Sequence, residues 1–362
     1  MTVARGEQHS GEEPMTPPEG PRRFGCHEST PPLDLLDPRQ GPAAPGLTSS
    51  DLDRGTLKTL SDRGYQLIGG HSGAKLCHWT RERLLNGRSC YKGRFYGIES
   101  HRCLQMTPTV DHCNEHCLFC WRHHNLQGMA TGEADEPEAI IEAAIAAQRR
   151  MLSGYRGDER VDEGDWEQAR HPRHVAISLA GEPTLYPRLG ELIAGYHRRG
   201  MTTFLVTNGT NPQALANLDP LPTQLYVTVA APSKEIFQRL VSPVMPDSWE
   251  RLHQTLALLP SLSCRTVLRH TLVEGYNLGW ELEYARIDAI GAPHFVECKG
   301  YVNVGESRNH LTQAHMPSFE KVQNFGERLA SHLGYGLVDG EAASRVVLLQ
   351  RPGTVRMLDL GA

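Results

Sequence analysis

The sequence has no apolar stretch long enough to cross a bilayer, and it has no amino-terminal run typical of a secretory signal. Cysteine is too scarce for a disulfide scaffold, with 9 residues in a chain of 362. Basic side chains are not in excess either. The net charge of −5 argues against a protein that coats nucleic acid with its whole surface. These absences predict a cytoplasmic protein that has no membrane partner.

The first part of the chain also lacks large apolar side chains. Residues 1–55 are instead rich in proline, glycine, serine and charged residues. Such a composition buries too little apolar surface to offset the entropy lost on ordering. We therefore predict a disordered tail over 1–55, and we do not expect Cys26 within it to bind a metal.

Six of the nine cysteines lie between positions 77 and 120. Cys113, Cys117 and Cys120 form a Cys-x3-Cys-x2-Cys pattern, which we call the loop set. Three thiolates on one loop can hold three irons of a 4Fe-4S cube and leave the fourth iron open to another ligand. A structural zinc site is the alternative, because zinc takes four protein ligands and several histidines are close in sequence. These are His112, His116, His123 and His124.

Cys77, Cys90 and Cys103 form a second group, the upstream set, spaced thirteen residues apart. A zinc knuckle normally has two close pairs of ligands, and this even spacing does not provide them. Single thiols on separate segments suit a cluster held between those segments.

The loop set resembles the cluster motif of radical S-adenosylmethionine (SAM) enzymes. Over residues 65–125 the chain resembles archaeal-type tRNA 4-demethylwyosine synthases more specifically. This resemblance rests on both cysteine sets and on the segments 90–92, 95–98 and 101–106. A thinner similarity continues from about 56 to 350.

The resemblance implies a lyase activity on RNA. In that family the loop-set cluster cleaves SAM, and the upstream cluster lies beside the substrate. Pyruvate donates two carbons to N1-methylguanosine-37 of tRNA(Phe), giving 4-demethylwyosine. The resemblance thus implies two 4Fe-4S clusters and SAM as cofactors, and pyruvate and the tRNA(Phe) anticodon loop as partners. Because no flavodoxin-like domain precedes the motif, we expect a separate flavodoxin- or ferredoxin-type electron donor.

Two other functions remain open from the sequence. One is a radical SAM enzyme that acts on a small metabolite or a peptide, which would need neither the upstream set nor a reactive lysine. The other is a non-catalytic iron-sulfur protein that binds RNA.

Lys92 follows Cys90 by two positions. If this segment is extended, both side chains face the same way, so the amine points toward the upstream cluster. A lysine amine can condense with an α-keto acid to a Schiff base. The resemblance assigns this role to Lys92, whereas a solvated lysine is the ordinary alternative. Lys299 is the second candidate for the reactive amine.

Beyond the cysteine loop, strand-like and helix-like runs alternate. Repeated β-α units imply a parallel sheet. Six strands fit the partial (β/α)6 barrel of radical SAM enzymes, so the fold class is α/β with an N-terminal cluster-binding extension. We expect strands at 104–110, 174–179, 202–206, 224–229, 266–273 and 293–298. Helices are expected at 136–152, 189–199, 234–240, 247–259, 280–290 and 319–333.

The remaining segments complete this organisation. The extension covers 56–103, the barrel covers 104–350, and a C-terminal tail covers 351–362. Polar residues 154–170 are predicted to form a surface insertion, and 344–349 to extend or cap the sheet.

Cofactor-binding residues of such a barrel belong at the carboxyl ends of its strands. Gly181 and Glu182 follow the second strand and resemble the Gly-Gly-Glu element that holds the SAM amino group. After the fourth strand the resemblance leads us to expect an acid, which this chain lacks. The further candidates at strand ends are Asn208, Thr228 and Asn277.

RNA recognition requires cations and stacking surfaces. Basic residues outnumber acidic ones between 58 and 124, which favours contact with phosphates, although a solvated polar face has the same composition. A target base splayed out of the loop would stack on aromatic or guanidinium planes. The candidates are Trp79, Tyr91, Tyr96, Trp121 and Arg122, and core packing is the alternative for the aromatic ones.

Overall fold

The computed structural model of the chain describes residues 54–110, 112–122 and 134–360. Almost all of the predicted tail, with Cys26, lies outside the described residues, as do His123 and His124.

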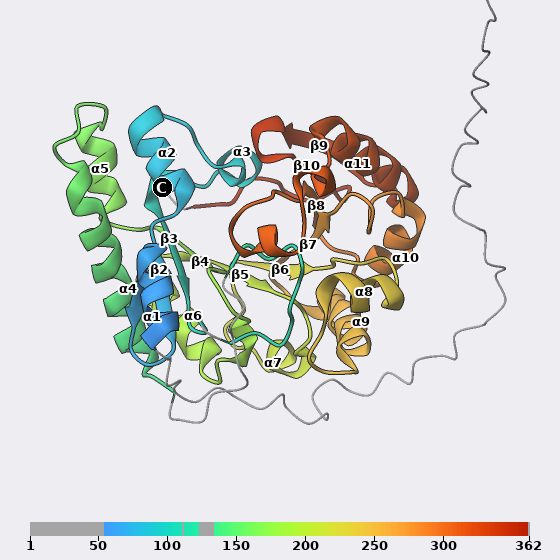
Figure 1. The fold of residues 1–362 in the computed structure, drawn as a ribbon, viewed down its shortest axis with the longest axis horizontal. Helices are drawn as coiled ribbons and strands as arrows, with labels where there is room; N and C mark the ends of the chain where they lie inside the picture. The colour runs from blue at the N-terminus through green and yellow to red at the C-terminus, as the bar shows by residue number, and fades with distance from the viewer. Residues whose placement is uncertain (1–53, 111, 123–133, 361–362) are drawn as a thin grey trace, which may run out of the picture. The chain divides into compact units, whose positions relative to one another are not determined.

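Six parallel strands form the centre of the fold, as Figure 1 shows. They pair in sequence order, and each is followed by at least one helix before the next begins. The predicted partial barrel is confirmed, with strand ends shifted by up to three residues. The strands are β3 (Cys103–Thr107), β4 (His174–Ile177), β5 (Thr202–Thr207), β6 (Gln224–Thr228), β7 (Arg265–Leu272) and β8 (Phe295–Gly300).

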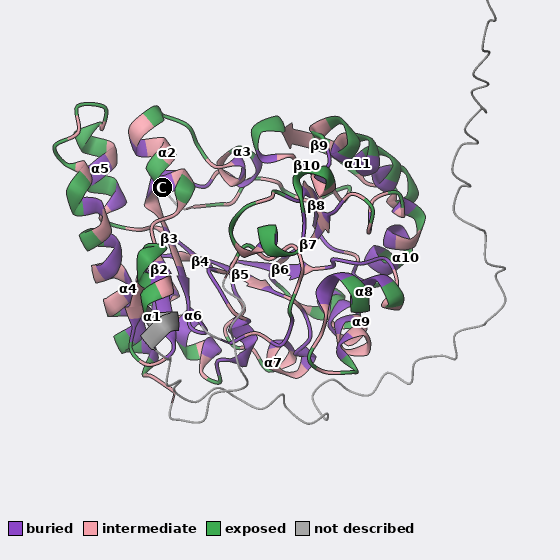
Figure 2. Cartoon of the chain, in the orientation of Figure 1, coloured by how far each residue is buried: buried purple, intermediate pink, exposed green. Residues whose placement is uncertain are grey.

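Helices cover the outer face of these strands. Their apolar sides pack on the sheet and their polar sides face outward, so the strands are mostly buried in Figure 2. All six predicted helices are present, and α7 is an additional short one. They are α4 (Pro137–Leu152), α6 (Leu189–Arg198), α7 (Pro212–Ala216), α8 (Lys234–Val241), α9 (Ser248–Leu258), α10 (Glu281–Gly291) and α11 (Phe319–Leu333).

Antiparallel strands extend the sheet at both edges. β1 (Tyr65–Ile68) and β2 (Ser72–Lys75) precede β3, so the N-terminal extension continues the barrel sheet. At the other edge β10 (Val346–Gln350) pairs with β8 and carries β9 (Gly336–Glu341). The prediction that 344–349 extends the sheet is confirmed.

The extension also contains α1 (Arg54–Asp62), α2 (His78–Asn86) and α3 (Tyr91–Tyr96). The extended backbone considered above as a condition for residues 90–92 is not found. Cys90 itself is extended, with ψ 146°, but the chain turns into α3 immediately after it. Gly97, with φ 83°, ends this helix in the left-handed conformation that glycine permits.

The polar stretch 154–170 is more than a surface insertion. It forms α5 (Glu163–Ala169), whose first turn is capped by the Asp162 carboxylate. Trp166 is buried and donates its indole N–H to the Leu152 carbonyl at 2.9 Å. One buried side chain therefore fixes a segment whose composition is otherwise typical of a loop.

Alternate residues of the barrel strands face an inner space that we call the lumen. Large side chains from β5 to β8 pack there against Phe95 and Tyr96 of α3. The C-terminal segment closes over this end, because Leu358 N–H donates to the Tyr96 carbonyl at 3.0 Å. The Arg265 guanidinium donates to the Arg356 carbonyl at 2.7 Å. The amino end of the lumen is thus plugged by α3 and by residues 351–360.

Candidate functional site

The loop set lies just beyond the carboxyl end of β3. Its backbone is fixed against the end of α8, since the N–H groups of His116 and Leu118 donate to carbonyls at Val241 and Leu240. Cys113, Cys117 and Cys120 are all partly buried. The three thiols are close enough that Cys113 and Cys120 both raise the pKa of Cys117.

Two acids, Glu115 and Glu182, lie near Cys113 of the loop set, and Arg122 lies near Cys120. Burial raises the pKa of Cys113 and of Cys117 well above the usual range, and the nearby Glu115 carboxylate raises both further. The Cys117 thiol donates to Glu115 Oε2 at 3.4 Å. Three partly buried thiols of raised pKa need a strongly cationic partner to ionise, and an iron cluster supplies one. The loop set fits a cluster on this ground.

The upstream set is assembled from three elements. Cys77 and Cys90 occupy the positions just before α2 and α3, and Cys103 begins β3. Burial raises the pKa of Cys90 to about 12, with Cys77 adding to the effect. Burial also raises the pKa of Cys103, again with contributions from Cys77 and Cys90. The three thiols interact, although they are distant in sequence.

No three histidine, cysteine or acidic side chains among the described residues lie close enough to share one metal ion. The ligands of a 4Fe-4S cube can lie farther apart than the ligands of a single ion, because each iron of the cube takes its own thiolate. Thiols too far apart for one ion are compatible with a cube, and His123 and His124 of the zinc alternative lie outside the described residues.

Lys92 projects from α3 into the lumen. Its Nζ lies 4.2 Å from the centre of the Tyr226 ring and 5.5 Å from that of Phe204. Burial lowers the pKa of Lys92, and Arg269 lowers it further, whereas Glu297 and the upstream thiols Cys90 and Cys103 oppose this. The amine is therefore more readily neutral than an exposed lysine, as nucleophilic attack requires.

Lys299, from β8, also faces the lumen. Its Nζ donates to the Ser344 carbonyl at 2.7 Å and lies 5.2 Å from the centre of the Tyr91 ring. Burial, followed by Arg269, lowers its pKa to about 8. The structure thus places both candidate amines in the same space, with Lys299 tied to a backbone carbonyl.

Two charged residues of the lumen were not singled out from the sequence. Glu297 of β8 is fully buried, and Arg269 of β7 pairs with it at 2.9 Å. Both residues interrupt strands that otherwise read as buried. Buried strands rarely carry an unpaired charge, so these two charged residues could have been picked out from the sequence.

Gly181 and Glu182 follow β4 and tie the loop set to the sheet. Gly181 has φ +65°, and an added Cβ would overlap the carbonyl oxygens of Thr109 and His112. Its Glu182 neighbour donates its N–H to the His112 carbonyl at 2.7 Å. The Glu182 carboxylate accepts from Thr184 and Thr207 hydroxyls at 2.6 Å each. A direct contact between this carboxylate and SAM would have to compete with these donors.

The other predicted SAM contacts differ in their accessibility. Asn208 donates to Asn114 Oδ1 at 2.7 Å, which links the end of β5 to the loop set. Thr228 lies half-buried at the end of β6. Asn277 is fully buried, and its amide bonds the carbonyls of Ala230 and Thr271 at 2.8 Å each. A SAM contact by Asn277 would require this network to open.

The aromatic candidates for base stacking divide in the same way. Tyr96 is fully buried and Tyr91 is 7% exposed, so both pack in the lumen. Trp121, next to the loop set, is 36% exposed. Arg122 and Lys75 place their cations 4.9 and 5.6 Å from the Trp121 ring centre. Of these three aromatic residues, Trp121 is the one accessible to a base.

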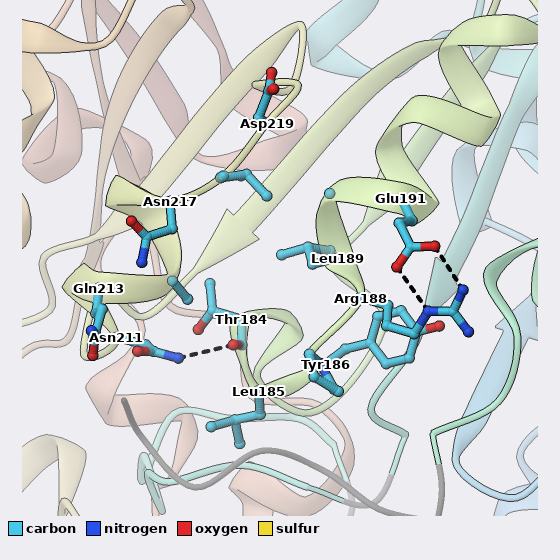
Figure 3. A pocket seen from close by; sticks show the side chains of 14 residues that line it. Thr184, Leu185, Tyr186, Arg188, Leu189, Glu191, Asn211, Gln213, Asn217 and Asp219 are labelled. Carbon is cyan, nitrogen blue, oxygen red and sulfur yellow. Dashed lines mark hydrogen bonds and ion pairs between the residues drawn. The ribbon is translucent and has the colours of Figure 1, made fainter. Parts of the chain in front are cut away.

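A cavity of about 490 Å³ lies elsewhere, between the start of α6 and α7 (Figure 3). In Figure 3 Asn211 bonds the Thr184 carbonyl and Arg188 pairs with Glu191. Neither cysteine set nor a lumen lysine lines this cavity.

In the described part of the chain no helix is both long and apolar enough to span a bilayer.

Comparisons with known families agree with the geometry. Residues 107–285 match the radical SAM superfamily, and residues 290–351 match the family described as wyosine base formation. The superfamily is defined by SAM and a 4Fe-4S cluster, so these two cofactors follow from the match.

Relatives from archaea and eukaryotes give a more specific similarity. The tRNA 4-demethylwyosine synthase of Pyrococcus abyssi is 48% identical over 293 residues, which cover 79% of this chain and 86% of the relative. The Methanocaldococcus jannaschii enzyme is 39% identical and covers 81% of this chain and 94% of the relative. The human enzyme, TYW1, is 40% identical over 75% of this chain, which spans only 37% of that protein.

Two solved structures share the fold. TYW1 with a lysine-pyruvate adduct bound has a TM-score of 0.78 and 36% identity, and the match covers 86% of this chain and 100% of that one. Archaeal TYW1 has a TM-score of 0.72 and 34% identity, with coverage of 85% and 100%. The resemblance drawn from the cysteine sets is confirmed, and the chain belongs to the S-adenosyl-L-methionine-dependent tRNA 4-demethylwyosine synthase family.

Proposed function

We propose that this chain converts N1-methylguanosine-37 of tRNA(Phe) into 4-demethylwyosine, with pyruvate as the carbon donor. The observation that carries the proposal is the position of Lys92, a lumen amine of lowered pKa beside the upstream thiols. A solved relative at 36% identity carries a lysine-pyruvate adduct, which is the chemistry that this amine suits.

Each cysteine set has its own task in this proposal. Cys113, Cys117 and Cys120 hold the cluster that binds SAM, and Cys77, Cys90 and Cys103 hold a second cluster beside pyruvate. When bound, the first cluster and SAM supply one-electron cleavage of SAM to a carbon radical. The carbonyls at the end of α8 and the backbone N–H of Glu182 keep the loop set in place for this step.

Lys92 performs the step that belongs to the protein itself. Its neutral amine attacks the keto carbon of pyruvate, and loss of water gives an imine that stays attached to α3. Lys299 and Arg269 add positive charge to the same space, which favours the pyruvate carboxylate. These charges would attract the carboxylate of a small keto acid toward Lys92.

We assign the electrons to a separate flavodoxin- or ferredoxin-type donor and the reaction to the cytoplasm, where tRNA and SAM are available. The anticodon loop enters from the carboxyl ends of the strands, because the amino end of the lumen is plugged by α3. Trp121 is the accessible aromatic surface on that side.

The test is a complete reaction with carbon-labelled pyruvate. Reduced, cluster-loaded protein is incubated with SAM, labelled pyruvate and tRNA(Phe) that carries N1-methylguanosine-37, and the nucleosides are analysed by mass spectrometry. We expect label in a tricyclic base at position 37. SAM cleavage without any labelled nucleoside would favour the metabolite or peptide enzyme, and a failure to cleave SAM would favour the non-catalytic alternative.

A further inference from the structure

Helix α3 carries Lys92, yet it has only six residues. A helix of this length is not stable on its own in water, so tertiary contacts must hold it. Two of its tyrosines reach the same carboxylate on β8. Tyr91 donates its hydroxyl to Glu297 Oε2 at 3.1 Å, and Tyr96 donates to Glu297 Oε1 at 2.8 Å. One side chain therefore fastens both ends of the helix.

The carboxylate is itself held firmly. Arg269 donates to Glu297 Oε2 from Nε at 3.1 Å and from Nη2 at 2.9 Å. The same Nη2 also donates to the Tyr91 hydroxyl at 3.2 Å. Hydrogen bonds to a buried, charged acceptor are short and strong, and a fully satisfied network of this kind is rigid. Glu297 thereby joins β7, β8 and α3 at one point.

Lys92 depends on this attachment for its own position. Its amine packs over the Tyr226 ring, and no hydrogen bond to it is found among the described residues. Because only ring contacts hold the side chain, the position of the amine depends on the position of the α3 backbone. Any shift of α3 would therefore shift the amine relative to the upstream thiols.

We propose that Glu297 is a positioning residue for the Schiff-base amine of Lys92. This inference rests on the proposed function. No ion pair between Glu297 and the Lys92 amine is found among the described residues, although the two charges influence each other's pKa. Glu297 acts through Tyr91, Tyr96 and the helix that they belong to, and it also places one negative charge near an imine that is cationic when protonated.

The test measures imine formation on Lys92 by borohydride trapping, over a range of pyruvate concentrations, in cluster-loaded protein. Glu297→Gln keeps the size of the side chain but replaces one acceptor by a donor that faces other donors. We expect the maximal trapping rate to fall at least about tenfold, with half-saturating pyruvate changed by less than about twofold. SAM cleavage without pyruvate should be retained, since it depends on the loop set.

Glu320→Gln is the matched control, because it makes the same change on the exposed face of α11. Its trapping rate should equal that of the wild type. Tyr96→Phe removes one donor from Glu297 while the ring and the charge remain. A fall of about threefold in the maximal rate is expected from this variant, which also decides the question if Glu297→Gln does not fold.

Each result has one meaning. Wild-type trapping rates in Glu297→Gln and Tyr96→Phe would overturn the positioning role while the proposed function stands. A loss of trapping that accompanies a loss of about half the iron would also overturn it, because Glu297 would then serve the upstream cluster. A wild-type chain that traps no pyruvate on Lys92 would overturn this role together with the pyruvate step.

Discussion

Each cysteine set contains three thiols, but their charged neighbours differ: two acids lie near the loop set, with Arg122 beside Cys120, and two lysines lie near the upstream set. Glu115 and Glu182 lie near the loop set and raise the pKa of Cys113. Lys92 and Lys299 lie near Cys90 of the upstream set and lower its pKa against the effect of burial. SAM carries a sulfonium and an ammonium group, whereas pyruvate is an anion. The surroundings of each set thus suit a different small molecule.

The two sets also differ in how the chain builds them. The loop set lies within eight consecutive residues, whose backbone is fixed by hydrogen bonds to the end of α8. The upstream set needs α2, α3 and β3 to come together. The first should therefore tolerate distant changes better than the second, since its geometry is mostly local.

Removing a ligand of the loop set is expected to have the largest effect. Cys117→Ala deletes one iron ligand, so reduced protein should form no detectable 5'-deoxyadenosine from SAM. Cys264→Ala is the control, because Cys264 is a buried thiol just before β7 and belongs to neither set. SAM cleavage that persists in Cys117→Ala would contradict the assignment of the loop set.

Lys92→Arg should abolish product while leaving SAM cleavage intact. The guanidinium keeps the positive charge but is not a primary amine, so it cannot form the imine. Borohydride trapping should detect no adduct, and no 4-demethylwyosine should form. The parallel variant Lys299→Arg should still give the trapped adduct and still form 4-demethylwyosine. The opposite pattern would transfer the role to β8.

Cys103→Ala is expected to remove the upstream cluster while the loop-set cluster remains. Iron should fall from about eight to about four atoms per chain, and SAM cleavage should persist, because a cube with a missing ligand is lost while the other remains. Iron and sulfide analysis beside the cleavage assay measures this. Full iron in Cys103→Ala would show that the upstream thiols do not hold a cluster.

Gly181→Ala tests the carboxyl end of the barrel. The new Cβ would overlap two carbonyl oxygens, so we expect a loss of about 3 kcal/mol in the free energy of unfolding, with weaker SAM binding. Gly200 has φ +69° and open space around its Cα. Gly200→Ala should therefore cost only about 1 kcal/mol, from the backbone conformation alone. Equal losses in urea unfolding would contradict the steric argument.

The pH dependence of stability tests the contribution of His174, which lies at the amino end of β4. Burial lowers the pKa of His174 to about 4, and its ring bonds Thr202 Oγ1 at 2.6 Å and the Glu99 N–H at 3.2 Å. The unfolded chain takes up this proton near pH 6.5, before the folded chain does. Stability is thus complete above pH 6.5 and falls by up to about 3 kcal/mol as the pH drops to 4. His174→Gln should lack this component of the pH dependence.

Much of the barrel followed from the sequence alone. The strands β4 to β8, four to eight residues long, read as largely apolar runs between helix-period segments, and both patterns are local. The two cysteine sets were also visible, because their spacing needs no knowledge of the fold. Burial of both faces explains why the parallel strands stand out.

The parts that escaped prediction depend on tertiary contacts. β2 reads Ser-Gly-Ala-Lys, which has no strand signal, and it is a strand because it pairs with β1 and β3. α3 contains Gly93 and is held by Glu297, which lies two hundred residues away in the chain. Spacing indicated that Lys92 lies near Cys90 but did not indicate the helix, since a short helix held by distant residues leaves no local sequence pattern.

The plug at the amino end of the lumen has a kinetic consequence. A space with one open end admits its contents in sequence, and whatever is bound nearer the mouth blocks what lies deeper. Lys92 is in the deep part, next to the plugging rings. Under the proposed function, the keto acid would load before the RNA covers the mouth, and the RNA would depart before the next keto acid enters. Steady-state kinetics should accordingly be compulsory-ordered, with excess tRNA acting as an inhibitor at low pyruvate.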